Sequence, residues 1–157
     1  MNPEELKLFE EEKPKYRIKA TGEIVDLEWL EKIISIYQER LKKISEIIEL
    51  TDFFFKDKLE YKRGLLKWGE MSDKEITVSL DKLEKILSKI EEGDWQKENL
   101  ERILILEAEK IGDKGKLLWP LRVALTGKEA SAPPFEIAVI LGKEKTLKRI
   151  GEAKQKI

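Results

Sequence analysis

Arg122 is the side chain whose sequence context points most clearly to chemistry. It lies one turn into the run 120–127, and the residues on both sides of it are apolar. A guanidinium carries five hydrogen-bond donors in a fixed fork and no acceptor, so it requires a partner rich in acceptors. Arg122 is therefore either the partner of an acidic residue such as Glu136 or a group directed at a ligand.

A proline-containing segment follows, in which polar groups are held in a fixed pose. Residues 128–133 are expected to form a loop, and the sequence from Ser131 to Pro134 reads Ser-Ala-Pro-Pro. Prolines stiffen such a loop, so less conformational entropy is lost when it binds a ligand. The hydroxyl of Ser131 is a candidate contact. The alternative is an ordinary turn that packs Phe135 into the core.

The composition excludes several classes of catalytic and metal site. The 157 residues include no cysteine and no histidine. Disulfides, thiolate or imidazole metal ligands, and Ser–His or Cys–His nucleophiles are therefore excluded. A carboxylate pair among the 32 acidic residues is more typical of a solvated surface. We expect no catalytic residue and no metal site in this chain.

Charge is unevenly distributed along the sequence. The net charge is −1, yet residues 116–157 hold nine Lys and Arg against four Glu. A basic face is what an anionic partner needs, whereas lysines at helix ends also complement helix dipoles. The run Lys143–Arg149 likewise either touches phosphates or is a solvated surface. Composition leaves these alternatives open.

The sequence also bears on location. No apolar run approaches the roughly 18 residues of a membrane span. The acidic N-terminal region lacks the positive start and apolar stretch of a signal peptide, and the absence of cysteine fits a reducing compartment. We expect a cytoplasmic protein without a membrane partner.

Helical periodicity dominates the first half of the chain. Residues 1–25 are expected to be irregular. Asp26 is a plausible N-cap for one long helix that ends around residues 50–52, and a second helix is predicted over about 58–69. Ser72 to Glu75 reads as a capping box opening another helix.

The second half continues the helical pattern. Gly93 is expected to end the helix that starts at Ser72, and Asp94 to cap the next helix, which runs to Gly112. Pro120 is placed in the first turn of a helix that Gly127 ends. A short helix over about 134–141 and a last one over 143–156 complete the pattern. Three tryptophans, Trp29, Trp68 and Trp95, are expected in the core, and Trp119 remains free to stack on a base.

These elements predict an all-α bundle of about seven helices and no sheet. The best internal boundary lies between Gly69 and the Ser72 box. We therefore expect two packed helical subdomains, residues 1–71 and 72–157.

Three parts of the sequence resemble the C-terminal anticodon-binding region of bacterial-type glutamyl-tRNA synthetase. The strongest is Pro120–Gly142, with its Pro-started helix, Gly stop, Pro-rich loop and short helix. The second runs from Tyr37-Gln38-Glu39-Arg40-Leu41 through Phe53–Phe55, and the third is Trp95 with the helix after it. The resemblance implies the α-helix cage fold and a domain that binds the anticodon loop.

The resemblance also implies roles for four residues. In the family, one arginine on the long helix distinguishes C from G at the third anticodon base, and the matching position is Arg40. Arg122 would contact the first base, and Ser131 and Pro134 would lie where the middle bases are bound. Here the chain departs from the family, which usually has Ser-Pro-Pro-Leu at this loop. The alternative for Arg40 is a solvated residue paired with nearby glutamates.

Cofactors and partners follow from the same resemblance. The family's nucleotide-binding half, with its His-Ile-Gly-His-like and Lys-Met-Ser-Lys-like motifs, is absent from this sequence. ATP and Mg²⁺ are thus expected only in that missing half. The expected partners are the anticodon stem-loop of tRNA(Glu) and the catalytic domain of the same enzyme, and not DNA. The competing hypothesis is an all-α protein-interaction module without RNA binding, which needs an exposed apolar patch.

Overall fold

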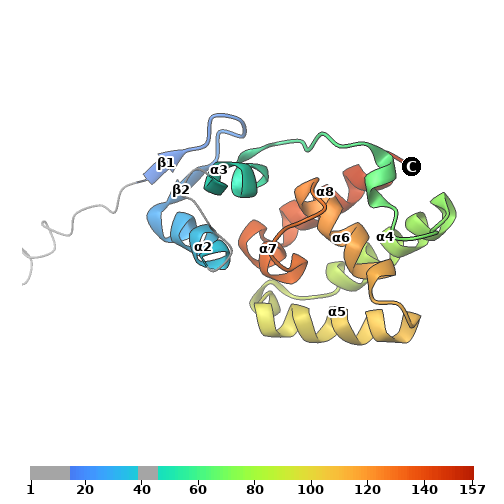
Figure 1. The fold of residues 1–157 in the computed structure, drawn as a ribbon. Coiled ribbons are helices and arrows are strands. Elements are labelled where there is room, and N and C mark those ends of the chain that lie inside the picture. Colours follow the sequence, from blue (N-terminus) through green and yellow to red (C-terminus); the bar gives the residue numbers. More distant parts are fainter. Residues whose placement is uncertain (1–14, 39–45) are drawn as a thin grey trace, which may run out of the picture.

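The structure, a computed structural model, describes residues 15–38 and 46–157, and helices dominate it (Figure 1). The α-helices are α2 (Leu27–Tyr37), α3 (Glu46–Thr51), α4 (Asp73–Ser88), α5 (Lys97–Ile111), α6 (Gly115–Thr126), α7 (Pro134–Leu141) and α8 (Lys143–Lys154). Short 3-10 helices cover Asp52–Phe55 (η1), Arg63–Leu66 (η2) and Glu92–Asp94 (η3). Seven α-helices within the described ranges confirm the predicted all-α class.

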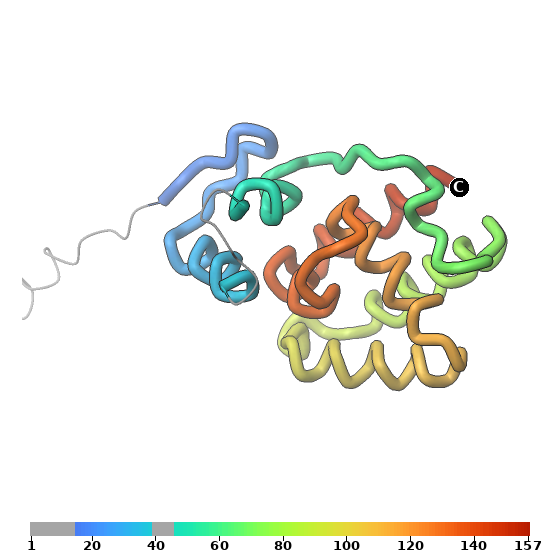
Figure 2. Tube along the Cα trace, viewed as in Figure 1, coloured from blue at the N-terminus to red at the C-terminus, as the bar shows by residue number. Residues whose placement is uncertain are grey.

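Three helices, α4, α6 and α8, pack on one another at the centre of the bundle. The helix α5 lies along α6 and α7, and α2 packs against α7 (Figures 1 and 2). Buried apolar side chains from both sides of residue 71, among them Phe53 and Leu121, belong to one core. The division into subdomains 1–71 and 72–157 stays a prediction.

The predicted capping box and two of the predicted glycine helix ends are confirmed. The Ser72 hydroxyl accepts a hydrogen bond from the Glu75 amide at 3.3 Å, and the Glu75 carboxylate accepts one from the Ser72 amide at 2.8 Å. This reciprocal bonding lowers the pKa of Glu75, first through the Ser72 backbone hydrogen bond. Gly112 and Gly127 end α5 and α6 with φ of 87° and 67°, a left-handed conformation that favours glycine.

The predicted absence of a sheet is wrong. Strands β1 (Lys15–Arg17) and β2 (Ile24–Asp26) pair antiparallel, with Tyr16 opposite Val25. Gly22, at φ 74°, lies in the turn that joins them. Strands of three residues are too short to show a period of two, so periodicity could not reveal them.

The single long helix predicted from Asp26 to about residue 51 is also wrong. Asp26 does cap α2, accepting a hydrogen bond from the Trp29 amide at 2.9 Å. However, α2 ends at Tyr37, and Ile34 of α2 lines the same groove as Ile48 of α3. In one straight helix these two residues would be about 21 Å apart. Only part of the predicted apolar stripe is buried: Ile33 and Tyr37 of α2 lie in the core, whereas Ile34 and Ile48 are exposed.

Two further boundaries differ from the prediction. Residues 58–69 form only the short η2 helix, since Leu59 and Leu66 bury their side chains from a segment that crosses the bundle. The helix α4 ends at Ser88, and Gly93 lies inside η3. Asp94 does not cap α5, whose N-cap is Gln96.

Pro120 lies inside α6, not in its first turn. A proline at this position leaves the carbonyl of Lys116, four residues earlier, without its helical donor. The Ser79 hydroxyl of α4 donates to that carbonyl at 2.8 Å. One buried serine therefore allows a proline in the middle of the helix that carries Arg122.

We predict that Ser79→Ala lowers the free energy of unfolding by about 1 kcal/mol, because it leaves the Lys116 carbonyl unsatisfied. In a Pro120→Ala background the restored amide can bond that carbonyl, so Ser79→Ala should cost less there, with a coupling of about 0.5 kcal/mol or more. Urea denaturation of the four proteins measures the coupling. Ser88→Ala, whose hydroxyl bonds Lys85 within α4, is the control and should show no coupling to Pro120.

Candidate nucleic-acid interface

Arg122 is half-buried on α6, between side chains that the core covers completely. Its Nη1 donates to the backbone carbonyl of Glu129 at 3.4 Å. Within the described residues it makes no ion pair. Glu136 pairs instead with Lys97 at 2.8 Å and, mainly through that hydrogen bond, raises the pKa of Lys97. The alternative of an Arg122–Glu136 pair is therefore wrong.

Many other cations of residues 116–157 are already paired. Each of five lysines lies within 3.2 Å of a carboxylate from residues 1–115: Lys116–Glu75, Lys128–Asp52, Lys145–Glu23, Lys148–Asp57 and Lys154–Asp81. The uneven charge of the sequence thus ties the C-terminal helices to the preceding part of the chain. Arg122 differs from these lysines in having only a weak backbone contact.

Arg149 is neither at a solvated surface nor free to touch a phosphate. It is 1% exposed, and its guanidinium donates to three backbone carbonyls. Burial lowers the pKa of Arg149 to about 10, so it remains protonated at neutral pH. The basic run 143–149 therefore contributes less positive surface than its sequence suggests.

The loop after α6 presents Ser131 at its surface. Ser131 is half-buried, and its hydroxyl donates to the Ala132 carbonyl at 2.7 Å. Ala132 is fully buried, and Pro134 is buried at the first position of α7. The Pro134 ring thus faces the core, which leaves the Ser131 hydroxyl and the loop backbone as the groups nearer to solvent.

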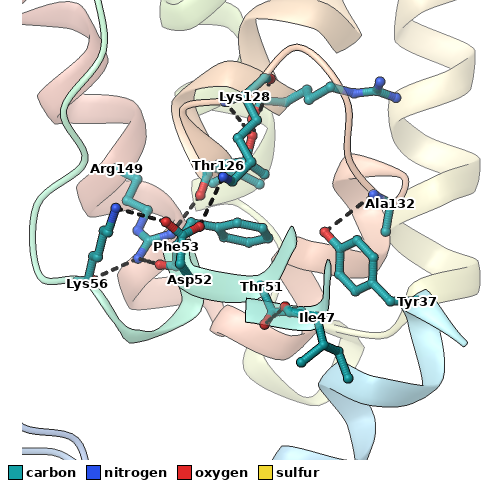
Figure 3. Close-up of polar contacts among 12 residues, drawn as sticks. Tyr37, Ile47, Thr51, Asp52, Phe53, Lys56, Thr126, Lys128, Ala132 and Arg149 are labelled. Carbon is teal, nitrogen blue, oxygen red and sulfur yellow. Dashed lines mark hydrogen bonds and ion pairs between the residues drawn. The ribbon is translucent and has the colours of Figure 1, made fainter. Parts of the chain in front are cut away.

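Arg40 lies outside the described residues. The last residue of α2, Tyr37, is buried, and its hydroxyl accepts a hydrogen bond from the Ala132 amide at 3.5 Å (Figure 3). The side chain at the end of α2 thus contacts the loop that carries Ser131. That Arg40, Arg122 and Ser131 converge on one face stays a prediction.

An open groove lies next to this contact. It is lined by residues of α2, the start of α5, and α7: Lys32, Ser35, Ile36, Gln38, Lys97, Glu136, Val139 and Ile140. Sequence reasoning missed Lys97 here and Lys128 in the loop. Their partners are far away in sequence, so only the fold brings each pair together.

The burial of the tryptophans differs in part from the prediction. Trp95 is buried and Trp29 is half-buried, and each donates its indole N–H to a carbonyl of α7. Trp68, predicted in the core, is 38% exposed and lies beside Trp119, with ring centroids 5.3 Å apart. Trp119 is half-buried and donates to the Leu65 carbonyl at 2.8 Å, so its indole N–H is engaged within the protein.

Neither a metal centre nor a membrane span is found in the described part of the chain. Its acidic side chains form no group of three or more that could hold a metal ion. Of the helices in residues 15–38 and 46–157, none combines the length and apolar character needed to cross a membrane.

Comparisons with known proteins identify the family of the chain. Residues 6–154 match the family model described as anticodon binding domain. The chain is 34% identical over 126 residues to glutamate–tRNA ligase of Bacillus licheniformis and 38% identical over 122 residues to that of Clostridium kluyveri. These matches cover 78% and 76% of the chain but 25% of each relative.

A solved structure is similar as well. It is a glutamate tRNA ligase from Elizabethkingia meningosepticum in complex with its amino acid, with a TM-score of 0.69 and 26% sequence identity. The similarity covers 83% of this chain and 25% of that chain. The chain therefore spans about a quarter of the length of the relatives it matches.

We predict that Arg122→Gln leaves the free energy of unfolding within about 0.5 kcal/mol of the unmodified chain, because glutamine keeps much of the aliphatic stem and only one long hydrogen bond is lost. Urea denaturation followed by tryptophan fluorescence measures the difference. A loss of about 2 kcal/mol or more would instead assign Arg122 to the support of the fold.

Proposed function

Because the chain belongs to the anticodon-binding domain family, we propose that it recognises the anticodon loop of tRNA(Glu) for a glutamate–tRNA ligase. Relatives with that name are four times longer than the part they share with this chain, which supports a parent enzyme whose chemistry takes place elsewhere. In this proposal the chain binds the anticodon loop, discriminates between tRNAs, and orients the bound tRNA toward the catalytic domain.

The observation that carries the proposal is the state of Arg122. Five lysines of residues 116–157 are held by carboxylates, whereas Arg122 keeps its guanidinium in a weak contact with a backbone carbonyl. Sequence-specific RNA recognition works mostly on unpaired bases, whose edges are free to hydrogen-bond. A guanidinium with unused donors beside a Pro-stiffened loop suits such an edge, and Ser131 adds a hydroxyl on the same loop.

Arg40 is proposed to read the third anticodon base. A cytosine edge offers two adjacent acceptors, which match the donors of a guanidinium. A guanine edge places donors at the matching positions, so the same arginine rejects it by repulsion. Glutamate and glutamine anticodons differ by C and G at this base. Arg40 would therefore make the parent enzyme reject tRNA(Gln).

The remaining partners belong to the parent enzyme. ATP and Mg²⁺ would act in its catalytic domain, where glutamate is activated and attached to tRNA. We propose that the anticodon stem-loop and that domain are the partners of this chain, that it does not bind DNA, and that it works in the cytoplasm, where translation takes place.

One observation favours a second candidate, a protein-interaction module. An open groove between α2 and α3 is lined mainly by apolar side chains, and Ile48 beside it is 72% exposed. Exposed apolar patches commonly mark protein contacts. This hypothesis does not explain why the family match covers residues 6–154.

A titration with RNA tests the proposal. Two fluorescent anticodon stem-loops of glutamate and glutamine type, differing at the third anticodon base, are titrated with the chain at low salt. We expect tighter binding to the C form, by at least about tenfold, as one bidentate contact provides. Arg40→Gln should abolish this preference, and Arg122→Gln should weaken binding to both RNAs.

Arg102→Gln on the exposed face of α5 is the matched control and should change neither affinity. Each phosphate neutralised on the single-stranded loop should add about −0.7 to the slope of log K against log salt. Equal binding to both RNAs would refute discrimination by Arg40 but keep RNA recognition. No binding to either RNA at low salt would refute the proposal for the isolated chain and favour the protein-interaction module.

A further inference from the structure

Arg149 of α8 is a buried cation that binds backbone instead of a carboxylate. Its Nη1 donates to the Leu125 carbonyl at 2.6 Å, and its Nη2 donates to the carbonyls of Phe53 at 2.6 Å and Lys56 at 3.0 Å. The side chain is 1% exposed, so it cannot touch RNA itself. A buried charge is retained only when hydrogen bonds replace its hydration, and these carbonyls do so at Nη1 and Nη2, while the buried Nε has no hydrogen-bond partner within the described residues.

The three carbonyls belong to two segments that are distant in sequence. Leu125 lies in the last turn of α6, where helix carbonyls have no partner of their own. The negative end of the α6 dipole also lies there, which favours a cation. Phe53 and Lys56 lie in and just after η1, the continuation of α3. Arg149 therefore joins the end of α6 to the segment after α3.

A second link joins the same two segments (Figure 3). Lys128, the first residue after Gly127, lies 3.0 Å from Asp52 Oδ1, and Lys56 lies 2.9 Å from Asp52 Oδ2. Asp52 is partly buried, yet its pKa is lowered because hydrogen bonds and charge from the two lysines outweigh desolvation. Two contacts therefore hold this region: Arg149 holds the end of α6 at Leu125, and Asp52 holds the loop after it at Lys128.

We infer that Arg149 is a positioning residue for the loop 127–133, holding Arg122 and Ser131 where an anticodon loop meets them. The inference rests on the proposed function for the identity of the ligand, but the positioning itself can be measured without RNA. The hydrogen bond to Leu125 anchors the last turn of α6 to α8, and Arg122 is about one helical turn before Leu125. The tie at Phe53 and Lys56 sets the distance to the segment that follows α3.

The geometry requires arginine and not merely positive charge. Two nitrogens of one planar group reach carbonyls from different segments at the same time, as a rigid fork allows. A lysine ammonium is a compact point charge on a flexible stem, so it would not hold all three carbonyls in this arrangement. Arg149→Lys therefore separates the effect of the fork from the effect of the charge.

Hydrogen exchange of the free protein is the first test. We expect amides of residues 127–133 to exchange at least about tenfold faster in Arg149→Lys and Arg149→Met, measured below the unfolding transition of each variant. Asp52→Asn removes the second link without emptying the core, so it should fold and show a smaller increase in the same loop. Arg102→Met, an exposed arginine of α5, is the matched control and should leave this loop unchanged.

RNA binding is the second test, made on whichever Arg149 variant is folded. We expect affinity for the glutamate-type stem-loop to fall about tenfold, with the salt slope retained because no phosphate contact is removed. Unchanged exchange in Arg149→Lys and Asp52→Asn, or unchanged RNA affinity in a folded Arg149 variant, would overturn the inference. If the unmodified chain binds neither RNA, the proposed function fails and the functional part of this inference fails with it. The exchange data would then still decide whether Arg149 positions the loop.

Discussion

The assembly of this bundle depends on satisfying one buried guanidinium. Desolvating a charge costs several kcal/mol unless hydrogen bonds replace the lost water, and carbonyls alone do so at Nη1 and Nη2 of Arg149, although not at its buried Nε. These acceptors come from η1, the residue after it and α6, and the donor comes from α8. Hydrogen bonds from Arg149 to backbone carbonyls therefore link the part before residue 71 to the part after it, and the two parts also share one core.

The distribution of charge has a related effect on recognition. Lysines of the C-terminal helices pair with acids from the rest of the chain, so much of the positive charge is compensated within the protein. Such surface pairs contribute little stability individually. They do weaken the long-range field that would attract any polyanion. A ligand of this chain must then be selected by a few directed hydrogen bonds and less by overall charge.

Sequence reasoning succeeded where structure is set locally. The Ser72–Glu75 box, the stops at Gly112 and Gly127, and the bounds of α7 follow from groups within a few residues of one another. It failed where distant contacts decide. The spacing of apolar residues over 27–48 looks the same whether or not the helix is interrupted, because each piece keeps the helical period by itself.

In the candidate site, too, some features follow from the local sequence and others depend on contacts between distant residues. Arg122 is a candidate because a lone charge among apolar neighbours is visible in the sequence, and its role stays a prediction. The tolerance of Pro120 inside the same helix could not be predicted, because it needs Ser79 of another helix. The importance of Arg149 was hidden as well. In sequence it follows Lys148 and resembles part of a basic surface, whereas in the fold it faces inward.

The order of η1, α6 and α8 along the chain has a consequence for how the protein is made. A ribosome releases η1 and α6 before α8, so the three carbonyls remain without their donor until α8 emerges. Until then water can solvate them, and of the two links described above only the Lys128–Asp52 ion pair can hold the loop after α6. A chain cut within α8 before Arg149 would therefore contain Arg122 and Ser131 but lack the hydrogen bonds that join the end of α6 to the segment after α3.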